Sequence, residues 1–233
     1  MISATDKAYQ DTKCIKLGVS EIDTHLKSLV CWVSKKYNVT VLNIVESILS
    51  HNNKIRISVH LETQQDALKF YKYHDWCGNF DTSKLIKIAK KYLETRHLTQ
   101  TPIVKTFGDT FKRFPTLSDI FVSFSAFMPI AKAEANNAIP EQHIDALYTK
   151  TSHPEIWKIS RYFDRTTLFV FTDEQLYQFK NTTKYNPIED AYFQLLKTYD
   201  TFDYWKREDF NLTIDSKQNF NTNFDGNWYH YYL

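Results

Sequence analysis

The sequence predicts an α+β fold, a mostly antiparallel sheet with helices packed on it. Three observations support this prediction. Apolar and polar residues alternate in segments typical of half-buried strands. Other segments place apolar residues every three or four positions, as amphipathic helices do. The order helix, strand, strand, helix, strand occurs twice along the chain, which indicates two similar halves.

The first half begins with a polar arm at residues 1–13, followed by a short predicted strand at 14–19. Ser20 can then accept hydrogen bonds from the first free amides of a helix over 20–37. Apolar residues at helical spacing form one stripe on this helix: Ile22, Leu26, Leu29, Val30 and Val33. We expect this stripe to face the core.

Two strands follow this helix. The apolar spacing of residues 39–49 fits a helix and their β-branched content fits a strand. We assign a strand, because Asn52 and Asn53 then form a turn into the next one. In that next strand four apolar residues, Ile55, Ile57, Val59 and Leu61, alternate with Arg56, Ser58, His60 and Glu62. The second set should therefore share one sheet face.

The remainder of the first half contains a short helix at 66–71, a loop at 73–80 and a longer helix capped by Asp81. The apolar face of the longer helix is formed by Leu85, Ile86, Ile88, Ala89, Tyr92 and Leu93. A threonine-rich loop over 95–115 then marks the predicted boundary between the halves.

The second half begins with a buried strand at 120–127. A helical segment over 131–148 should break near Ile139, because Pro140 fits only the first turn of a new helix. Two strands are predicted at 155–163 and 165–171.

The last third of the chain supplies one more helix and two strands. Asn186, Pro187 and Glu189 form a capping sequence for a helix that ends near Tyr199. A strand at 210–214 and an aromatic strand at 228–233 complete the second half.

We therefore assign residues 14–115 to the first half and 116–233 to the second, packed together as one compact unit. With a leading strand, each half has the element order of a ferredoxin-like split βαβ unit, which suggests two such units in tandem. Residue identity between the halves is poor, so an accidental match of alternating helices and strands remains the alternative.

Composition limits the classes of partner. A net charge of +2 gives no overall field to attract nucleic acid or anionic lipid. The first residues are polar and no run of eighteen apolar residues occurs, so we expect no membrane segment. Three widely spaced cysteines disfavour a disulfide scaffold and favour a reducing, cytoplasmic location.

Several common catalytic motifs are absent. The four glycines stand alone, whereas phosphate-binding loops need several close together. The chain also lacks Cys-x-x-Cys, His-Glu-x-x-His and Gly-x-Ser-x-Gly. We therefore expect no cofactor and no bound metal, and we favour a protein that is not an enzyme.

Two groups of residues are nevertheless candidates for catalysis. His74 lies three positions before Cys77, and an imidazole can help a thiol to ionise. Arg56, His60 and Glu62 bring a cation, a base and an acid to one sheet face. As an alternative to catalysis, His74 and Cys77 would belong to a structural loop. Arg56, His60 and Glu62 would lie on a sheet face that is solvated or covered by a helix.

Aromatic and acidic residues near the end of the sequence are candidates for partner binding. Tyr and Trp dominate binding hot spots, and an edge strand made of them could dock a partner. The candidate contact residues are Trp228, Tyr229, Tyr231, Asp203, Asp209 and Asp215. The alternative is a core strand flanked by a charged loop.

The favoured function is a non-catalytic, cytosolic protein-binding protein, in the style of small bacterial inhibitors or toxin-neutralising immunity proteins. The first alternative is a hydrolase or transferase that uses one of the two catalytic groups. The second is a nucleic-acid-binding protein. It is disfavoured, because Glu94 and other acids dilute the lysine row of Lys84, Lys87, Lys90 and Lys91.

Overall fold

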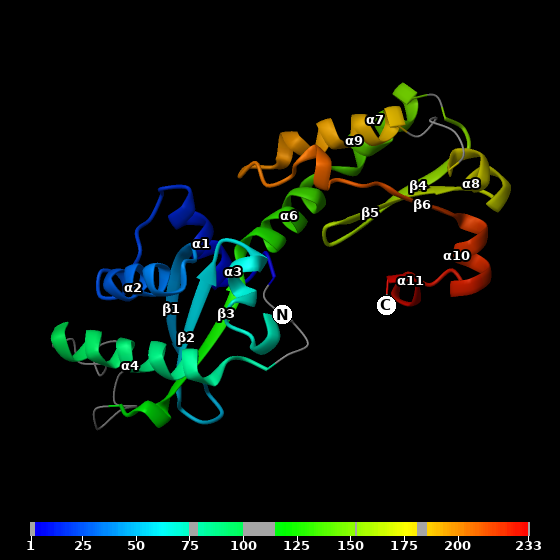
Figure 1. Cartoon of the computed structure of the whole chain (residues 1–233). Helices are drawn as coiled ribbons and strands as arrows, with labels where there is room; N and C mark the ends of the chain where they lie inside the picture. The colour runs from blue at the N-terminus through cyan, green and yellow to red at the C-terminus, as the bar shows by residue number, and fades with distance from the viewer. Residues whose placement is uncertain (1–2, 75–78, 100–114, 152, 181–185, 233) are drawn as a thin grey trace. The chain divides into compact units, whose positions relative to one another are not determined.

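A computed structural model describes residues 3–74, 79–99, 115–151, 153–180 and 186–232 (Figure 1). The chain forms two compact units, Met1–Pro129 and Ile130–Leu233, each with helices and one three-stranded sheet. The structure thus confirms the predicted α+β fold in two halves.

The first unit contains the sheet β1-β2-β3, in which β1 and β2 are antiparallel and β2 and β3 are parallel. Its strands are β1 Val41–Ile48, β2 Ile55–Leu61 and β3 Ile120–Ala126. Its helices are α1 Lys7–Lys16, α2 Lys27–Tyr37, α3 Gln64–Leu68 and α4 Thr82–Thr99, with short 3-10 turns η1 Lys72–His74 and η3 Leu117–Asp119.

The alternation predicted for β2 is present. Ile55, Ile57, Val59 and Leu61 are fully buried and pack with apolar residues of α2, α3 and α4. The region 39–49, which fitted either state, is strand β1. The opposite face of the sheet is more polar, and α1 packs on it through Thr12, which is bonded to Asn43 of β1.

The second unit contains the sheet β4-β5-β6, with β4 and β5 antiparallel and β5 and β6 parallel. Its strands are β4 Ile156–Tyr162, β5 Arg165–Val170 and β6 Thr213–Ser216. Its helices are α6 Phe127–Ala138, whose first residues belong to the first unit, α7 Glu141–Thr151, α8 Asp173–Lys180, α9 Asn186–Tyr199, α10 Lys217–Phe224 and α11 Trp228–Tyr232, with a 3-10 turn η5 Arg207–Asp209. Figure 1 shows α7 and α9 on one side of this sheet and α10 and α11 on the other.

The two units share their sheet topology. Val59 pairs with Phe124 in the first sheet, as Leu168 pairs with Ile214 in the second. His60 of β2 corresponds to Phe169 of β5, because each pairs with the residue that follows the register shift in the neighbouring strand, Asn43 of β1 and Lys158 of β4. The repeated order of elements that the sequence indicated is thus a repeated order of strand pairing.

Three details differ from the sequence prediction. Cys14 lies in α1, so the leading strand expected at 14–19 is not formed, and the polar arm is partly helical. The described sheets have three strands and mixed directions, whereas a ferredoxin-like sheet has four. The segment Trp228–Tyr232, which the sequence assigned to an aromatic strand, forms helix α11. Helical spacing lets Trp228, Tyr231 and Tyr232 cover one sheet face together.

The connection between the halves also differs in position. A division after residue 115 would place β3 in the second half, but β3 pairs along its whole length with β2. Helix α4 continues to Thr99, and residues 100–114 of the predicted loop lie outside the described part of the chain. The expected break near Ile139 is present between α6 and α7.

Candidate functional site

The predicted group of Arg56, His60 and Glu62 does share one face of the first sheet, but each residue has its own neighbour. The Arg56 Nε donates to Ser47 Oγ at 3.1 Å, and Glu62 forms an ion pair with Lys16 of α1 at 2.8 Å. His60 is 3% exposed, with its Nδ1 2.8 Å from Ser125 Oγ. Of the three, only His60 is buried, whereas Arg56 is exposed and Glu62 is half-buried, so the three side chains do not act as one group.

His60 is held in the neutral form by its surroundings. Burial lowers the pKa of its imidazole to about 4, and the positive charge of Arg56 acts in the same direction. The carboxylate of Asp11 on α1 opposes this shift only partly. Near pH 7 this imidazole is uncharged and out of reach of a bulky substrate.

The second catalytic candidate is the pair of His74 and Cys77. Cys77 lies outside the described residues, as does the side chain of His74, which ends the short turn η1. Among the residues that the structure does describe, no three His, Cys, Asp or Glu side chains are grouped to hold a metal ion.

Aromatic side chains cluster on the second face of the sheet in the second unit. Trp228 of α11 packs against Phe220 of α10, with ring centroids 4.2 Å apart, and against Phe169 of β5 at 5.4 Å. Tyr231 lies 5.2 Å from Phe169, and Trp157 of β4 stacks on Trp228 at 6.0 Å. This cluster occupies the face that α1 covers in the first unit.

Two tyrosine hydroxyl groups of α11 form hydrogen bonds with the sheet. Tyr231 donates to Asp215 Oδ2 at 2.7 Å, and Tyr232 donates to Ser160 Oγ at 2.8 Å. Burial, and secondly the hydrogen bond to Asp215, raise the pKa of Tyr231 above its ordinary value. A helix of five residues would not hold its position on propensity alone, so these contacts position its aromatic residues.

The edge of this cluster reaches the surface at the β4–β5 turn. Phe163 and Asp164 form a two-residue loop, since Tyr162 pairs with Arg165. Phe163 has a φ of 54° and is 50% exposed. Its ring lies 4.6 Å from that of Tyr162, which in turn stacks on Tyr232 at 4.5 Å.

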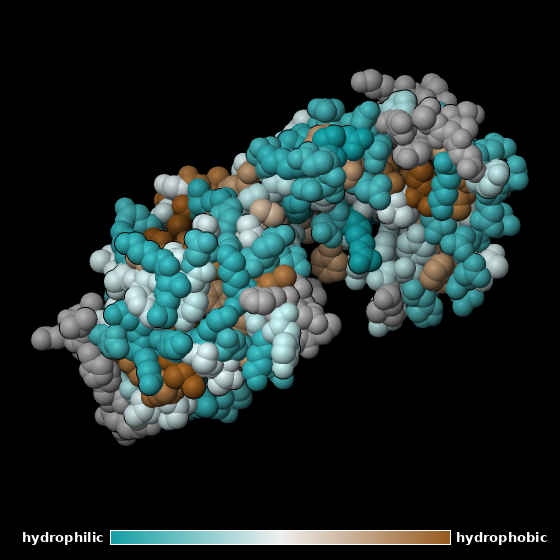
Figure 2. Space-filling view, in the orientation of Figure 1, coloured by the Kyte–Doolittle hydropathy of each residue, from teal (hydrophilic) through white to brown (hydrophobic). Residues whose placement is uncertain are grey.

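We call four aromatic residues of the β4–β5 turn and α11 the aromatic rim: the exposed Tyr162, Phe163 and Tyr229, and the half-buried Tyr232. Tyr229 is 69% exposed. Lysines border the cluster beside the rim, with Lys158 Nζ 5.3 Å from the Trp228 ring and Lys217 Nζ 4.9 Å from the Trp157 ring. Hydrophilic residues cover most of the visible face of each unit (Figure 2).

The acidic candidates have separate positions. Asp203 is paired with Lys197 and Lys206, whose hydrogen bonds hold the pKa of its carboxyl down at about 2. Asp209 is exposed in η5, and Asp215 lies beneath Tyr231. Of the predicted contact residues, the structure thus brings together Trp228, Tyr231 and Asp215, with Tyr229 on the same helix.

Sequence reasoning missed the contribution of the β4–β5 turn. Tyr162 and Phe163 were assigned only to the end of a strand. A signal was present, because the tight loop between two alternating segments contains no glycine or asparagine. A bulky residue in such a loop indicates a strained backbone position.

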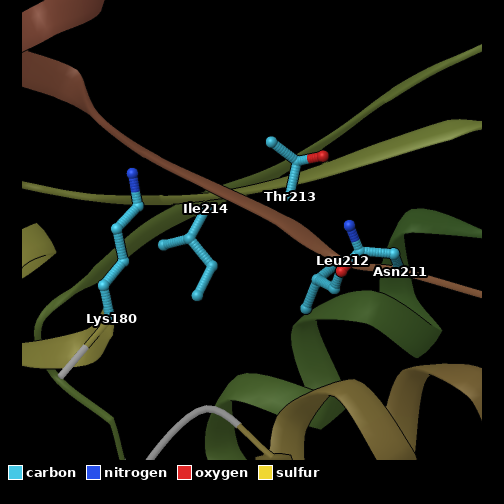
Figure 3. Close-up of a pocket in the computed structure, with 5 residues that line it drawn as sticks. All are labelled: Lys180, Asn211, Leu212, Thr213 and Ile214. Carbon is cyan, nitrogen blue, oxygen red and sulfur yellow. The ribbon is translucent and has the colours of Figure 1, made fainter. Parts of the chain in front are cut away.

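A pocket of about 260 Å³ lies along β6, lined by Lys180, Asn211, Leu212, Thr213 and Ile214. Leu212 and Ile214 point to one side of the strand and Thr213 to the other (Figure 3). None of the catalytic candidates is among the residues that line it.

Comparison with protein-family models, with curated proteins and with solved structures finds no match to this chain. Within the described ranges, none of the helices has both the length and the apolar character that crossing a bilayer requires.

Proposed function

We propose that the protein is a non-catalytic, cytosolic protein-binding protein of the bacterial inhibitor or toxin-neutralising type, which contacts its partner through the aromatic rim of the second unit. The observation that carries this proposal is the conformation of Phe163. A positive φ at the first position of a two-residue hairpin loop favours glycine, and a bulky residue there costs about 1 kcal/mol. An exposed aromatic side chain at a strained position is typical of a residue kept for contact.

The packing of the rim favours a protein over a nucleic acid. Bases stack on free ring faces. One face of Tyr162 is covered by Tyr232, and one face of Trp228 by Trp157, which leaves less ring face for a base to stack on. Rigid aromatic edges beside apolar and cationic groups are typical of protein hot spots.

The surroundings of the rim support a partner that carries carboxylates. Lys158 and Lys217 lie at the aromatic cluster, whereas Asp203 and Asp215 are engaged within the unit. This changes the role we expect for the acids: they position neighbouring groups, and the lysines meet the partner.

The enzyme alternative gains less support. Of its group, His60 is buried, Arg56 is exposed, and Glu62 is already paired with Lys16 of α1. A hydrolase or transferase site would have to open before a substrate could reach His60.

The test is affinity capture from the native lysate with the full chain as bait. We expect a stoichiometric partner that is retained by the unchanged chain and lost with Phe163→Gly and with Tyr229→Ala. Tyr177→Ala is the matched control, because Tyr177 on α8 is equally exposed at 69% but lies outside the rim.

Retention of the same partner by Phe163→Gly and Tyr229→Ala would contradict the proposal, as would the absence of any stoichiometric partner. The toxin-neutralising type makes one further prediction. Expression of the captured partner alone should arrest growth, and co-expression with this chain should restore it.

A further inference from the structure

Helix α1 is attached to the first unit by polar contacts as well as by one buried tyrosine. The Nδ2 of Asn43 donates to Thr12 Oγ1 at 3.3 Å, and Lys16 pairs with Glu62 at 2.8 Å. The aromatic contribution is the stacking of Tyr9 on Phe127, with centroids 4.9 Å apart. Water can replace polar contacts at low cost when a helix leaves, so α1 is easier to release than a helix held by apolar burial.

His60 lies under α1 with only one of its two ring nitrogens bonded. Its Nδ1 is 2.8 Å from Ser125 Oγ, while Nε2 is buried without a hydrogen-bond partner among the described residues. Whichever nitrogen carries the hydrogen of the neutral ring, the imidazolium would need a second acceptor at Nε2. The closed structure therefore accommodates the neutral ring and penalises the charged one.

The charged groups around His60 do not remove this penalty. Arg56 on the same strand is positive, and Asp11 on α1 is already paired with Lys7. Glu62 is neutralised by Lys16. From β1 and β3 the facing side chains are Asn43 and Ser125, which are uncharged.

We propose that α1 is a pH-sensitive strap, which covers the polar face of the first sheet near neutral pH and is displaced in acid when His60 becomes protonated. The strap lies in the first unit and does not depend on the aromatic rim. Its release would expose a row of hydrogen-bonding groups that includes Asn43, Ser58 and Ser125.

The second unit provides an internal contrast. Phe169 occupies the position that corresponds to His60, and the aromatic cluster of α10 and α11 covers it. The side chain of Phe169 has no ionisable group, so α10 should remain in place over the pH range in which α1 is released.

The direction and size of the effect follow from linkage. Burial in the closed form lowers the pKa of His60 from 6.5 to about 4. His60 therefore binds a proton more weakly when α1 is in place than when α1 is displaced. The ratio of displaced to closed α1 therefore rises as the pH falls below 6.5 and stops rising below the pKa of the closed form. Between pH 7.5 and pH 4.5 the ratio should rise on the order of 50-fold.

The experiment is amide hydrogen exchange of the full chain at pH 7.5, 6.0 and 4.5, with rates divided by those of an unstructured peptide at the same pH. We expect the protection of α1 amides to fall on the order of 50-fold in acid, while α10 amides keep theirs. With His60→Phe, the residue found at the corresponding position, α1 should stay protected at pH 4.5.

His60→Gln is the second variant, in case phenylalanine distorts the packing, because glutamine keeps a polar partner for Ser125 and does not titrate. The proposal is overturned if α1 loses protection equally in the unchanged chain and in a folded non-titrating variant. It is also overturned if α1 and β2 lose protection together, since that result indicates unfolding of the whole unit.

Discussion

The guanidinium of Arg96 on α4 is paired with the carboxylate of Glu46 on β1, and both groups are buried in the first unit. Arg96 is 1% exposed, and its Nε also donates to Tyr92 Oη at 3.3 Å. Glu46 in addition lies 3.1 Å from His25 Nε2. This network ties α4 and the start of α2 to the edge strand of the sheet.

Removing one partner of this pair should destabilise the first unit strongly. Glu46→Gln leaves the buried charge of Arg96 uncompensated, which costs about 3 kcal/mol or more. Urea unfolding followed by circular dichroism measures the loss. Glu94→Gln is the control, because Glu94 pairs with Lys91 on the surface of α4 and should change stability by less than about 1 kcal/mol. Equal effects of the two changes would contradict a structural role for the buried pair.

Asn136 on α6 should be the polar residue on which the second unit depends most. It is fully buried, donates to the Phe163 carbonyl at 3.1 Å, and accepts from Tyr192 Oη at 2.8 Å. Asn136→Leu removes both bonds, and we expect a loss of about 3 kcal/mol in thermal or urea unfolding. Tyr192→Phe removes only one of them and should cost about 1 kcal/mol. A tolerated Asn136→Leu would show that the β4–β5 turn is held in another way.

Phe163→Gly should stabilise the isolated protein even though it is expected to abolish partner binding. Glycine adopts the φ of 54° without the strain of about 1 kcal/mol, and its greater chain entropy offsets part of this gain, so we expect a net stabilisation of a few tenths of a kcal/mol. The melting temperature reports the change. A clear decrease would mean that the Phe163 ring is needed for folding, and the argument from strain would fail.

Tyr231→Phe should weaken the attachment of α11 and make the second unit less sensitive to alkali. Burial raises the pKa of Tyr231 above that of an unfolded tyrosine, so its hydrogen bond to Asp215 stabilises the fold below pH 10 and this stability is lost as the pH rises further. We expect a cost of about 1 kcal/mol at pH 7 and a smaller decline of stability above pH 10. Tyr229→Phe, on the exposed side of α11, is the control and should change neither quantity.

Features that depend on local sequence patterns were predicted more accurately than features that depend on long-range contacts. The alternation at 55–61, the break near Ile139 and the helix ending at Tyr199 were predicted correctly, because each depends on neighbouring residues. The segment ending in Trp228–Tyr232 was wrongly assigned to a strand, because five consecutive aromatic residues carry no clear period.

In the candidate site too, local geometry was predicted from the sequence and long-range contacts were not. The shared face of Arg56, His60 and Glu62 followed from strand geometry. The sequence did not predict that α1 would lie on this face, because Thr12 and Asn43 are 31 positions apart and neither residue indicates its partner. The prediction of aromatic contact residues at α11 stays a prediction, and the structure adds Tyr162 and Phe163 beside them.

The sequence by itself determined the α+β class, the repeated order of elements and the apolar buried face of strand β2. These features follow from short-range periodicity, which sets the hydrogen-bonded backbone and the side chains that leave water. Only the tertiary structure decided that β3 pairs with β2, that Arg96 is buried against Glu46, and that Phe163 has a strained backbone conformation beside α11. Those outcomes depend on contacts between residues far apart in the chain, where small differences in packing and desolvation select among several locally acceptable arrangements.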